Sequence, residues 1–227
     1  MGQEQPAVRH TLDAEELRAA LTIAWLDRFG TSPGPRSITL LLAHVALETG
    51  MTSCVNFNIG NCKATVGGAA DWCIFRTWEV EHGVKVPQDC PFRSFPDLAT
   101  GAAFYLGLLS NQFRGAWPAV RAGDPQMFAV LLAQQRYYTA PVAEYAAGMR
   151  ARFSHYWVML AQSLLIGAGY DLGPTGADGD EGHLTRSALA QFQAASGITT
   201  GAIDDATIAS LQGAQVPPAP DTLPEVA

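Results

Sequence analysis

Apolar residues recur at helical spacing along much of the chain. Leu17 and Leu21 lie four positions apart within residues 13–29, and this spacing predicts a helix there. Asp13 and Glu16 stand three positions apart at its start and resemble a capping box, which is a common way to begin a helix. The predicted first helix therefore has both an apolar face and a recognisable beginning.

The stretch LLAHVALETG predicts the end of a second helix, which begins near Ser37 and ends at Gly50. Leu41, Val45 and Glu48 stand at positions i, i+4 and i+7, so Glu48 shares a face with apolar residues. Burial and the negative end of the helix dipole both disfavour a carboxylate, so we expect a raised pKa for Glu48. Such a carboxyl suits a general acid. A surface glutamate on an otherwise buried helix is the alternative that the spacing leaves open.

A β-hairpin is expected after the Asn- and Gly-rich loop at residues 51–70. In CIFRTWEVEHGVKVPQDCPFRSF, β-branched and aromatic residues flank the turn signal His82-Gly83. Strand alternation places Glu79 and Glu81 on the same face. Two such acids are ordinary on a solvent-facing hairpin, but a glycosidase usually needs a second carboxylate and these are the candidates.

Three further helical patterns complete the first part of the chain. One covers residues 96–111, a second follows Asp124, and a third begins at Thr139. The third either continues as one long helix or breaks near Ser154. We therefore expect residues 1–155 to form a mainly α (α+β) domain with one β-hairpin.

The composition changes after Ile166. A Gly- and Asp-rich turn precedes a predicted helix at residues 184–196, and another turn precedes a short helix at residues 205–211. The Pro-rich end, residues 214–227, has no apolar periodicity and is interpreted as a disordered tail. No Pro/Gly/Ser linker separates this part from the first, so we expect a stiff or packed junction.

Composition and charge narrow the classes of ligand. Hydrophobic residues make up 48% and charged residues 15% of the 227 positions, which is typical of a well-packed globular protein. The net charge is −7 without a basic stripe, so neither nucleic acid nor an anionic membrane is an expected partner. Neutral or weakly charged ligands such as sugars fit better. No apolar run reaches the roughly 18–20 residues of a membrane span, so no membrane insertion is expected.

The four cysteines fall within one loop-rich segment. Cys54, Cys62, Cys73 and Cys90 lack the paired CxxC spacing of a zinc site. We interpret them as two disulfides, Cys54–Cys62 and Cys73–Cys90, because the second pair is nearly opposite in the predicted hairpin. Four buried thiols in a reducing compartment are the alternative.

The histidines show no spacing typical of metal ligands, so no metal site is expected. His44 precedes Glu48 by one helical turn, and we interpret it as a buried histidine with satisfied hydrogen bonds. Tuning of Glu48 by His44 is the alternative. No sequence motif indicates a cofactor.

Five motifs in order resemble glycoside hydrolase family 73. They are ALETG, NIGNCKA, RTWEVEHG, FRSFPDL and RYYTAP, and they span residues 35–153. This family contains lysozyme-like glucosaminidases of bacteria and phages, including the flagellar muramidase domain. The resemblance implies a lysozyme-like catalytic domain with a β-hairpin lobe over the cleft.

Site residues follow from the resemblance position by position. The family's general acid falls on Glu48, its second carboxylate on Glu79, and its site tyrosine on Tyr137. Glu81 is the alternative second carboxylate. The implied substrate-binding positions are Asn58, Lys63, Tyr138 and Thr139. The chain departs from the family where ETGMTSC lacks the aromatic residue of ESGWG, and where NIGNCK lacks a Phe and shifts the Gly.

Residues 156–213 resemble a three-helix peptidoglycan-binding domain. GAGYDLG, ADGDEGHLTRSALAQFQ and DDATIASL supply the turns and helices of that pattern. An unrelated helical bundle with an Asp-Gly turn is the alternative. The resemblance implies peptidoglycan as the partner of this domain.

The two resemblances together imply a peptidoglycan hydrolase of the endo-β-N-acetylglucosaminidase type, an endolysin-like bacteriolytic enzyme. A muramidase or lytic transglycosylase of the same fold is the nearest alternative. A non-catalytic wall-binding component of a virion or injection apparatus is another. The expected place of action is the bacterial cell wall, in the periplasm or outside the cell. MGQEQPAVRHTLDAEEL lacks the features of a secretory signal, so we expect either a mature form of the protein or delivery by another route, such as a phage tail or an injection device.

Overall fold

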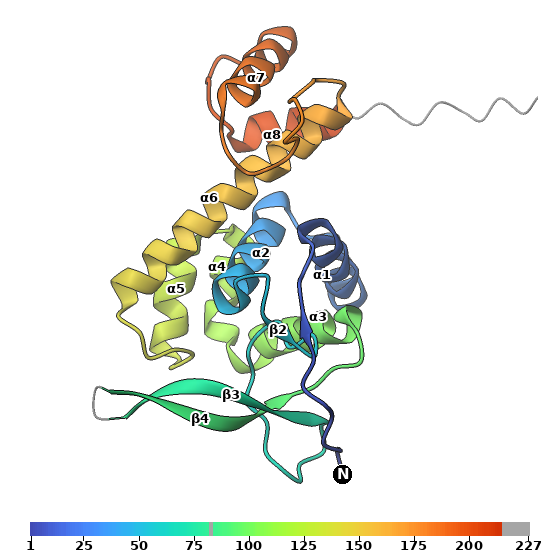
Figure 1. The fold of residues 1–227 in the computed structure, drawn as a ribbon. Helices are drawn as coiled ribbons and strands as arrows, with labels where there is room; N and C mark the ends of the chain where they lie inside the picture. Colours follow the sequence, from blue (N-terminus) through green and yellow to red (C-terminus); the bar gives the residue numbers. More distant parts are fainter. Residues whose placement is uncertain (82–83, 215–227) are drawn as a thin grey trace, which may run out of the picture. The chain divides into compact units, whose positions relative to one another are not determined.

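The structure is a computed structural model that describes residues 1–81 and 84–214 (Figure 1). Within the hairpin, the side chains of residues 78–81, 84 and 85 are outside the described part. The tail expected at residues 214–227 lies, after its first residue, outside the described residues as well.

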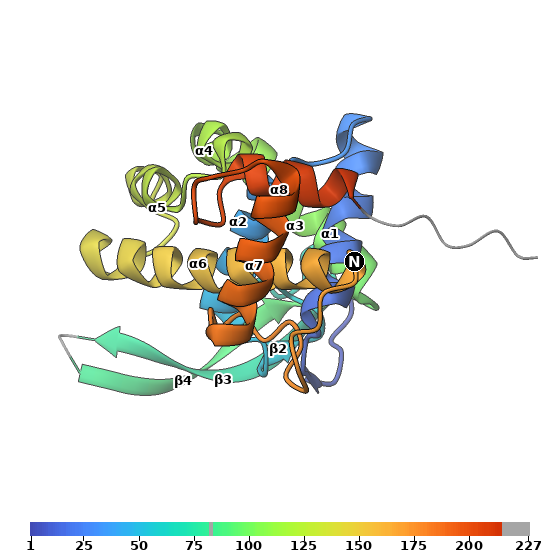
Figure 2. The same cartoon turned by 90° about the horizontal axis from the view of Figure 1, so that it is seen from above.

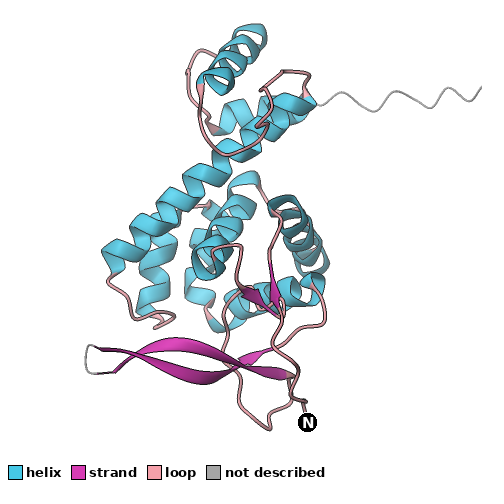
Figure 3. Ribbon diagram, viewed as in Figure 1, coloured by secondary structure: helices cyan, strands magenta, loops and turns pink. Residues whose placement is uncertain are grey.

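The chain divides into two compact units, Met1–Phe153 and Ser154–Ala227. The boundary falls inside helix α6 (Val142–Gly167), which is continuous across Ser154. Helices dominate both units, and strands β1 to β4 lie in the first (Figure 3). The mainly helical class with one long β-hairpin, predicted from the sequence, is confirmed.

The first unit consists of helices joined to two small antiparallel sheets. Its elements in chain order are β1 (Arg9–His10), α1 (Ala14–Phe29), α2 (Pro35–Thr49), β2 (Cys54–Val55), β3 (Trp72–Glu81), β4 (Val84–Arg93), α3 (Leu98–Gly107), the π-helix η1 (Leu108–Gln112), the 3₁₀-helix η2 (Arg114–Ala116), α4 (Trp117–Ala122), α5 (Pro125–Gln134) and the first part of α6. Strand β1 pairs with β2, and β3 pairs with β4. Over the described residues, no helix is long and apolar enough to span a membrane.

Local sequence signals set the ends of α1. The Asp13 side chain accepts hydrogen bonds from the backbone N–H groups of Glu15 and Glu16, which otherwise lack partners at a helix start. At the other end, Gly30 takes a left-handed conformation with φ of 69°, which costs glycine little. The apolar face of α1 packs against α3 and α2.

Helix α2 is the centre of the first unit. Its residues from Ser37 to Ala46 are all buried, so the helix is covered on every side. Gly50 ends it in a left-handed conformation with φ of 59°. Glu48 therefore stands in the last turn, where the buried helix comes to the surface.

Strands β3 and β4 form a long two-stranded ribbon that extends along one edge of the helices of the first unit (Figures 1 and 2). Their antiparallel register pairs Cys73 with Phe92 and Phe75 with Cys90. The two cysteines thus lie two positions out of register, on a diagonal rather than opposite one another.

The structure has all four cysteines as thiols, so the expected disulfides Cys54–Cys62 and Cys73–Cys90 were wrong. Diagonal neighbours in a sheet are about 7–8 Å apart, whereas a disulfide joins Cα atoms within roughly 7 Å. Burial raises the pKa of Cys54 to about 12 and that of Cys62 to about 11. Three of the four thiols are buried, as in the alternative interpretation, and Cys62 is half-buried.

The second unit contains the last part of α6 with α7 (His183–Ser196) and α8 (Asp205–Gly213). Both later helices match the ranges predicted from the sequence to within about two residues. Their small apolar core is formed by Leu165, Leu172, Ala188, Leu189, Phe192 and Leu211.

A buried glutamine holds the first turn of this unit. Gln162 donates to the Asp178 carboxylate, the Asp180 carbonyl and the Thr185 hydroxyl, and accepts from the N–H of Gly179. One side chain on α6 therefore satisfies polar groups from the turn and from the start of α7. Few apolar residues are available here, so such hydrogen bonds carry much of the local order.

Candidate active site

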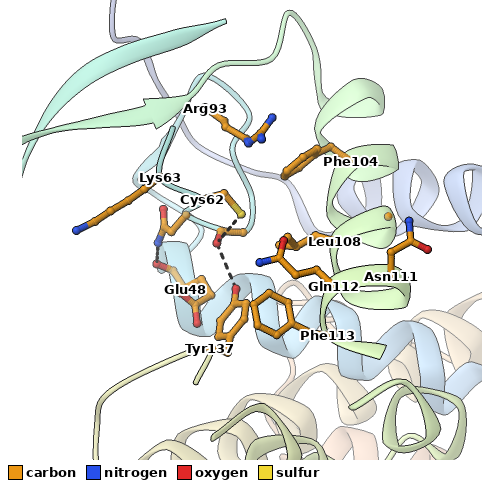
Figure 4. A pocket seen from close by; sticks show the side chains of 13 residues that line it. Glu48, Cys62, Lys63, Arg93, Phe104, Leu108, Asn111, Gln112, Phe113 and Tyr137 are labelled. Atoms are coloured by element: carbon orange, nitrogen blue, oxygen red, sulfur yellow. Dashed lines mark hydrogen bonds between the residues drawn. The ribbon is translucent and has the colours of Figure 1, made fainter. Parts of the chain in front are cut away.

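Glu48 stands where two cavities meet. The first, of about 800 Å³, is formed mainly by the loop at residues 60–63, Arg93, and the end of α3 with η1 (Figure 4). The second, of about 350 Å³, lies toward Arg9 and the strands β3 and β4. Glu48 and Asn61 line both cavities. A long ligand that passes from one cavity to the other would therefore cross the Glu48 carboxyl.

A chain of hydrogen bonds reaches Glu48 from the core. The Tyr145 hydroxyl lies 2.6 Å from Glu48 Oε1 and 2.9 Å from His44 Nε2. The Tyr105 hydroxyl lies 2.5 Å from His44 Nδ1. Tyr145 donates to Glu48 and accepts from the Nε2–H of His44, and Nε2 itself lies 3.5 Å from Glu48 Oε1. This series of hydrogen bonds ends at Oε1 of Glu48, where a donated hydrogen bond favours the ionised carboxylate.

These contacts reverse the pKa direction expected for Glu48. Burial is the largest single influence and raises the pKa of Glu48, as its apolar surroundings predict. The nearby His44, with Nε2 at 3.5 Å, and the hydrogen bond from Tyr145 together hold the pKa below its ordinary value. The expectation of a raised pKa was wrong because these two groups favour the charged form.

His44 therefore fulfils both interpretations of its position. It is fully buried between two tyrosine hydroxyls, and it also acts on Glu48. The tyrosines themselves stay protonated. Burial is the main cause of the raised pKa of Tyr145 and Tyr105, and the negative charge of Glu48 adds to it.

The loop that follows α2 is fixed around Asn58. This buried amide donates to the carbonyls of Cys62 and Arg93, and its oxygen accepts from the Cys62 N–H. Asn61 has a left-handed backbone with φ of 49°, and its side chain donates to the Glu48 carbonyl. The loop is thus tied both to strand β4 and to the last turn of α2, which carries Glu48. Asn58 and Lys63, both implied by the resemblance, line the second and first cavity, respectively.

Tyr137 lines the first cavity beside Glu48, as the resemblance implied (Figure 4). Its hydroxyl donates to the Gly60 carbonyl at 3.2 Å, and its ring meets Phe113 edge to face at 4.9 Å. Burial raises its pKa well above the ordinary value, so the hydroxyl remains a donor.

Two other positions implied by the resemblance lie outside the walls of both cavities. The ring of Tyr138 stacks on that of Tyr145 with 3.7 Å between the ring centroids, and the Tyr138 hydroxyl donates to the Ala129 carbonyl. Thr139 is exposed in the loop before α6. The structure therefore brings Glu48, Tyr137, Asn58 and Lys63 together around the cleft, whereas Tyr138 supports the tyrosine behind Glu48.

The two candidate second carboxylates are only partly described. Glu79 and Glu81 lie in strand β3, where their backbones pair with Val86 and Val84. Both side chains lie outside the described residues.

Sequence reasoning missed several groups at the site. Tyr145 lies 97 residues from Glu48 along the chain, and its helical position alone carried no signal of that contact. The π-helix η1 places Asn111 and Gln112 in the wall of the first cavity, and π turns are frequent at functional sites. Among the described residues, no group of three or more His, Cys, Asp or Glu side chains could hold a metal ion.

Comparison with known proteins gives one family match and several structural likenesses. Residues 155–211 match the family model described as a putative peptidoglycan binding domain, which confirms the resemblance drawn for this part. No curated protein sequence matches the chain.

The similar solved structures carry the names of cell-wall enzymes. A peptidoglycan hydrolase mutant from Sphingomonas sp. A1 is 22% identical, with 63% of this chain and 92% of that one covered and a TM-score of 0.43. A truncated glycoside hydrolase domain of FlgJ from Salmonella typhimurium is 21% identical, with 62% and 95% covered and a TM-score of 0.41. The catalytic domain of the autolysin Auto from Listeria monocytogenes is 17% identical, with 63% and 81% covered and a TM-score of 0.47.

Proposed function

We propose that this chain hydrolyses β-1,4 glycosidic bonds of peptidoglycan, as an endo-β-N-acetylglucosaminidase with Glu48 as the general acid. One observation carries the proposal: a half-buried carboxyl, held by a tyrosine hydroxyl, lines two neighbouring cavities. The match of residues 155–211 to a peptidoglycan-binding model supports the choice of substrate.

The lining of the cleft suits a saccharide. Phe104, Phe113 and Tyr137 present aromatic surface in the first cavity, with the amides of Asn111 and Gln112 beside them. Aromatic faces with a few polar groups are the usual composition of a small-ligand site. Because cavities open on both sides of Glu48, the arrangement fits a bond inside a polymer rather than one at its end.

The hydrogen bond from Tyr145 gives the two oxygens of the Glu48 carboxyl different roles. Oε1 accepts from Tyr145, so Oε2 carries the proton that passes to the leaving glycosidic oxygen. Water then supplies the hydroxyl group that bonds to the anomeric carbon. Glu79 stabilises positive charge at that carbon or activates the water, with Glu81 as the alternative.

The remaining residues of the resemblance bind the sugar in this proposal. Tyr137 orients the ring beside Glu48, while Asn58 and Lys63 shape and contact the two ends of the cleft. The second unit binds the wall and raises the local concentration of glycan at the cleft. The place of action is accordingly the bacterial cell wall.

The test combines one substitution with product analysis. Glu48→Gln keeps the hydrogen-bonding shape but cannot protonate the leaving oxygen, so clearing of purified peptidoglycan should fall by about 10²- to 10⁴-fold while binding is retained. Glu144→Gln, an exposed glutamate at the start of α6, is the matched control. Comparing Glu79→Gln with Glu81→Gln identifies the second carboxylate.

Mass spectrometry of the digested wall separates the alternatives. Reducing N-acetylglucosamine ends are expected. Reducing N-acetylmuramic ends would assign a muramidase, and 1,6-anhydromuramic ends a lytic transglycosylase. Equal clearing by the wild type and Glu48→Gln would refute the role of Glu48. Binding without clearing by the wild type would favour a non-catalytic wall-binding protein.

A further inference from the structure

Cationic side chains line both cavities around Glu48. Lys63 and Arg93 line the first cavity, and Arg9 and Arg76 line the second. Among the described side chains in the two walls, Glu48 is the single carboxylate. The whole chain has 21 acidic and only 14 basic residues, so this excess of cations at the cleft runs against its overall charge.

Two of these arginines are held in place by aromatic rings. The Arg93 guanidinium lies over Phe104, with Cζ at 4.7 Å from the ring centroid (Figure 4). The Arg9 guanidinium lies over Phe75 in the same way at 4.9 Å. Stacking uses the face of a guanidinium and leaves the N–H groups at its edge for a planar acceptor.

These two arginines have no acidic partner within the described part of the chain. Neither Arg9 nor Arg93 forms an ion pair there, whereas Arg76 lies 3.9 Å from Asp89 with both side chains well exposed. The cations also do not serve Glu48, because its ionisation is governed by burial, His44 and Tyr145. Among the described residues, Arg93 and Arg9 therefore remain available to a ligand in the cavities.

We propose that the cleft selects glycan that carries acidic peptides, with Arg93 and Arg9 binding peptide carboxylates on either side of the scissile bond. This inference rests on the proposed hydrolysis of peptidoglycan. Guanidinium groups bind carboxylates in a planar, two-pronged geometry that neutral sugar hydroxyls do not match. The preferred substrate is thus peptide-bearing glycan rather than a neutral N-acetylglucosamine polymer.

The test compares two preparations of the same soluble glycan strands with attached peptides. In one, carbodiimide and ammonia convert the peptide carboxylates to amides, which keeps their size and removes their charge. Wild-type kcat/KM is expected to be about tenfold lower on the amidated strands, from about threefold for each of the two arginine–carboxylate contacts, the size of a solvent-exposed ion pair.

Variants assign the preference to particular residues. Arg93→Gln should reduce the ratio of kcat/KM on charged and amidated strands to about threefold. Arg93→Gln combined with Arg9→Gln should abolish the difference, since the two arginines act on different parts of the ligand. Arg93→Lys keeps the charge and should retain a preference. Arg152→Gln, an exposed arginine of α6 outside both cavities, should behave like the wild type.

Several results would overturn the inference. If the wild type cuts both preparations equally while Glu48→Gln is inactive, the hydrolase stands and the selection for carboxylates fails. If Arg93→Gln lowers both rates by the same factor, Arg93 serves packing and the inference fails. If the wild type cuts neither preparation, the proposed function itself fails and takes the inference with it.

Discussion

The hydroxyl of Tyr145 can be deleted with little other change. In Tyr145→Phe the ring remains stacked on Tyr138, at 3.7 Å and with 8° between the planes. The lost hydroxyl is the middle link between His44 and Glu48, with contacts of 2.9 and 2.6 Å. The variant therefore isolates the contribution of one hydrogen bond to the catalytic carboxyl.

Two effects of opposite kind are expected from this substitution. A hydrogen bond to a charged group contributes about 1.5–3 kcal/mol, and each 1.4 kcal/mol is a factor of ten. Even the lower value predicts a loss of about tenfold in the plateau value of kcat/KM. The hydrogen bond from Tyr145 also lowers the pKa of Glu48. Its removal should raise that pKa.

The sign of the pH effect follows from the role of Glu48. A general acid is active when protonated, so activity is present below its pKa and is lost as the pH rises through it. The alkaline limb of the wild-type profile should therefore lie at low pH, because the pKa of Glu48 is lowered. In Tyr145→Phe the limb should move to higher pH while the plateau falls.

The assay is kcat/KM on soluble glycan strands across a range from about pH 4 to about pH 9, which spans the ordinary pKa values of Glu and His. Tyr138→Phe is the control, because its hydroxyl donates to the Ala129 carbonyl and not to Glu48. Its limb should coincide with that of the wild type. A Tyr145→Phe profile with an unchanged limb and plateau would refute the role given to this tyrosine.

Two further predictions concern the thiols and the second unit. In denaturant without reductant, iodoacetamide should add to four cysteines, and fewer than four adducts would reveal a disulfide. In the native protein, Cys54 and Cys62 should react slowly with iodoacetamide, because burial raises their pKa to about 12 and about 11. Gln162→Leu should lower the free energy of unfolding of the second unit by roughly 2–3 kcal/mol in urea, since it leaves buried polar groups unsatisfied. The exposed Gln191→Leu should change it by less than about 0.5 kcal/mol, and equal effects would contradict the structural role of Gln162.

Local patterns predicted the elements of this fold well. The capping carboxylate of Asp13 and the glycine at position 50 mark helix ends through contacts within a few residues, which a sequence displays directly. The long hairpin followed from β-branched residues around His82-Gly83. Its register also follows from that two-residue turn, because pairing Glu81 with Val84 pairs Cys73 with Phe92 and leaves Cys90 two positions from Cys73.

The site was predictable only where one helix carries it. Glu48 was a candidate from its own helix, since an acid on an apolar face is visible in the spacing, although the spacing alone left a surface glutamate open. The partners that set its ionisation come from elsewhere: Tyr145 is 97 residues away, and Tyr105 is 61 residues from His44. Periodicity gives the side of a helix on which a residue lies, but not which distant hydroxyl will meet it.

The lowered pKa of Glu48 is compatible with its work as an acid because substrate changes the balance. In the free protein, burial already raises the pKa more than any other single influence, and His44 with Tyr145 outweighs it. A saccharide that fills the cavities on both sides removes the remaining water from the carboxyl, whose side chain is 17% exposed. That loss of solvation raises the pKa of Glu48 further, while the contacts to Tyr145 and His44, on the core side, stay in place. Binding thus favours protonation of Glu48 when a glycosidic oxygen is present to receive the proton.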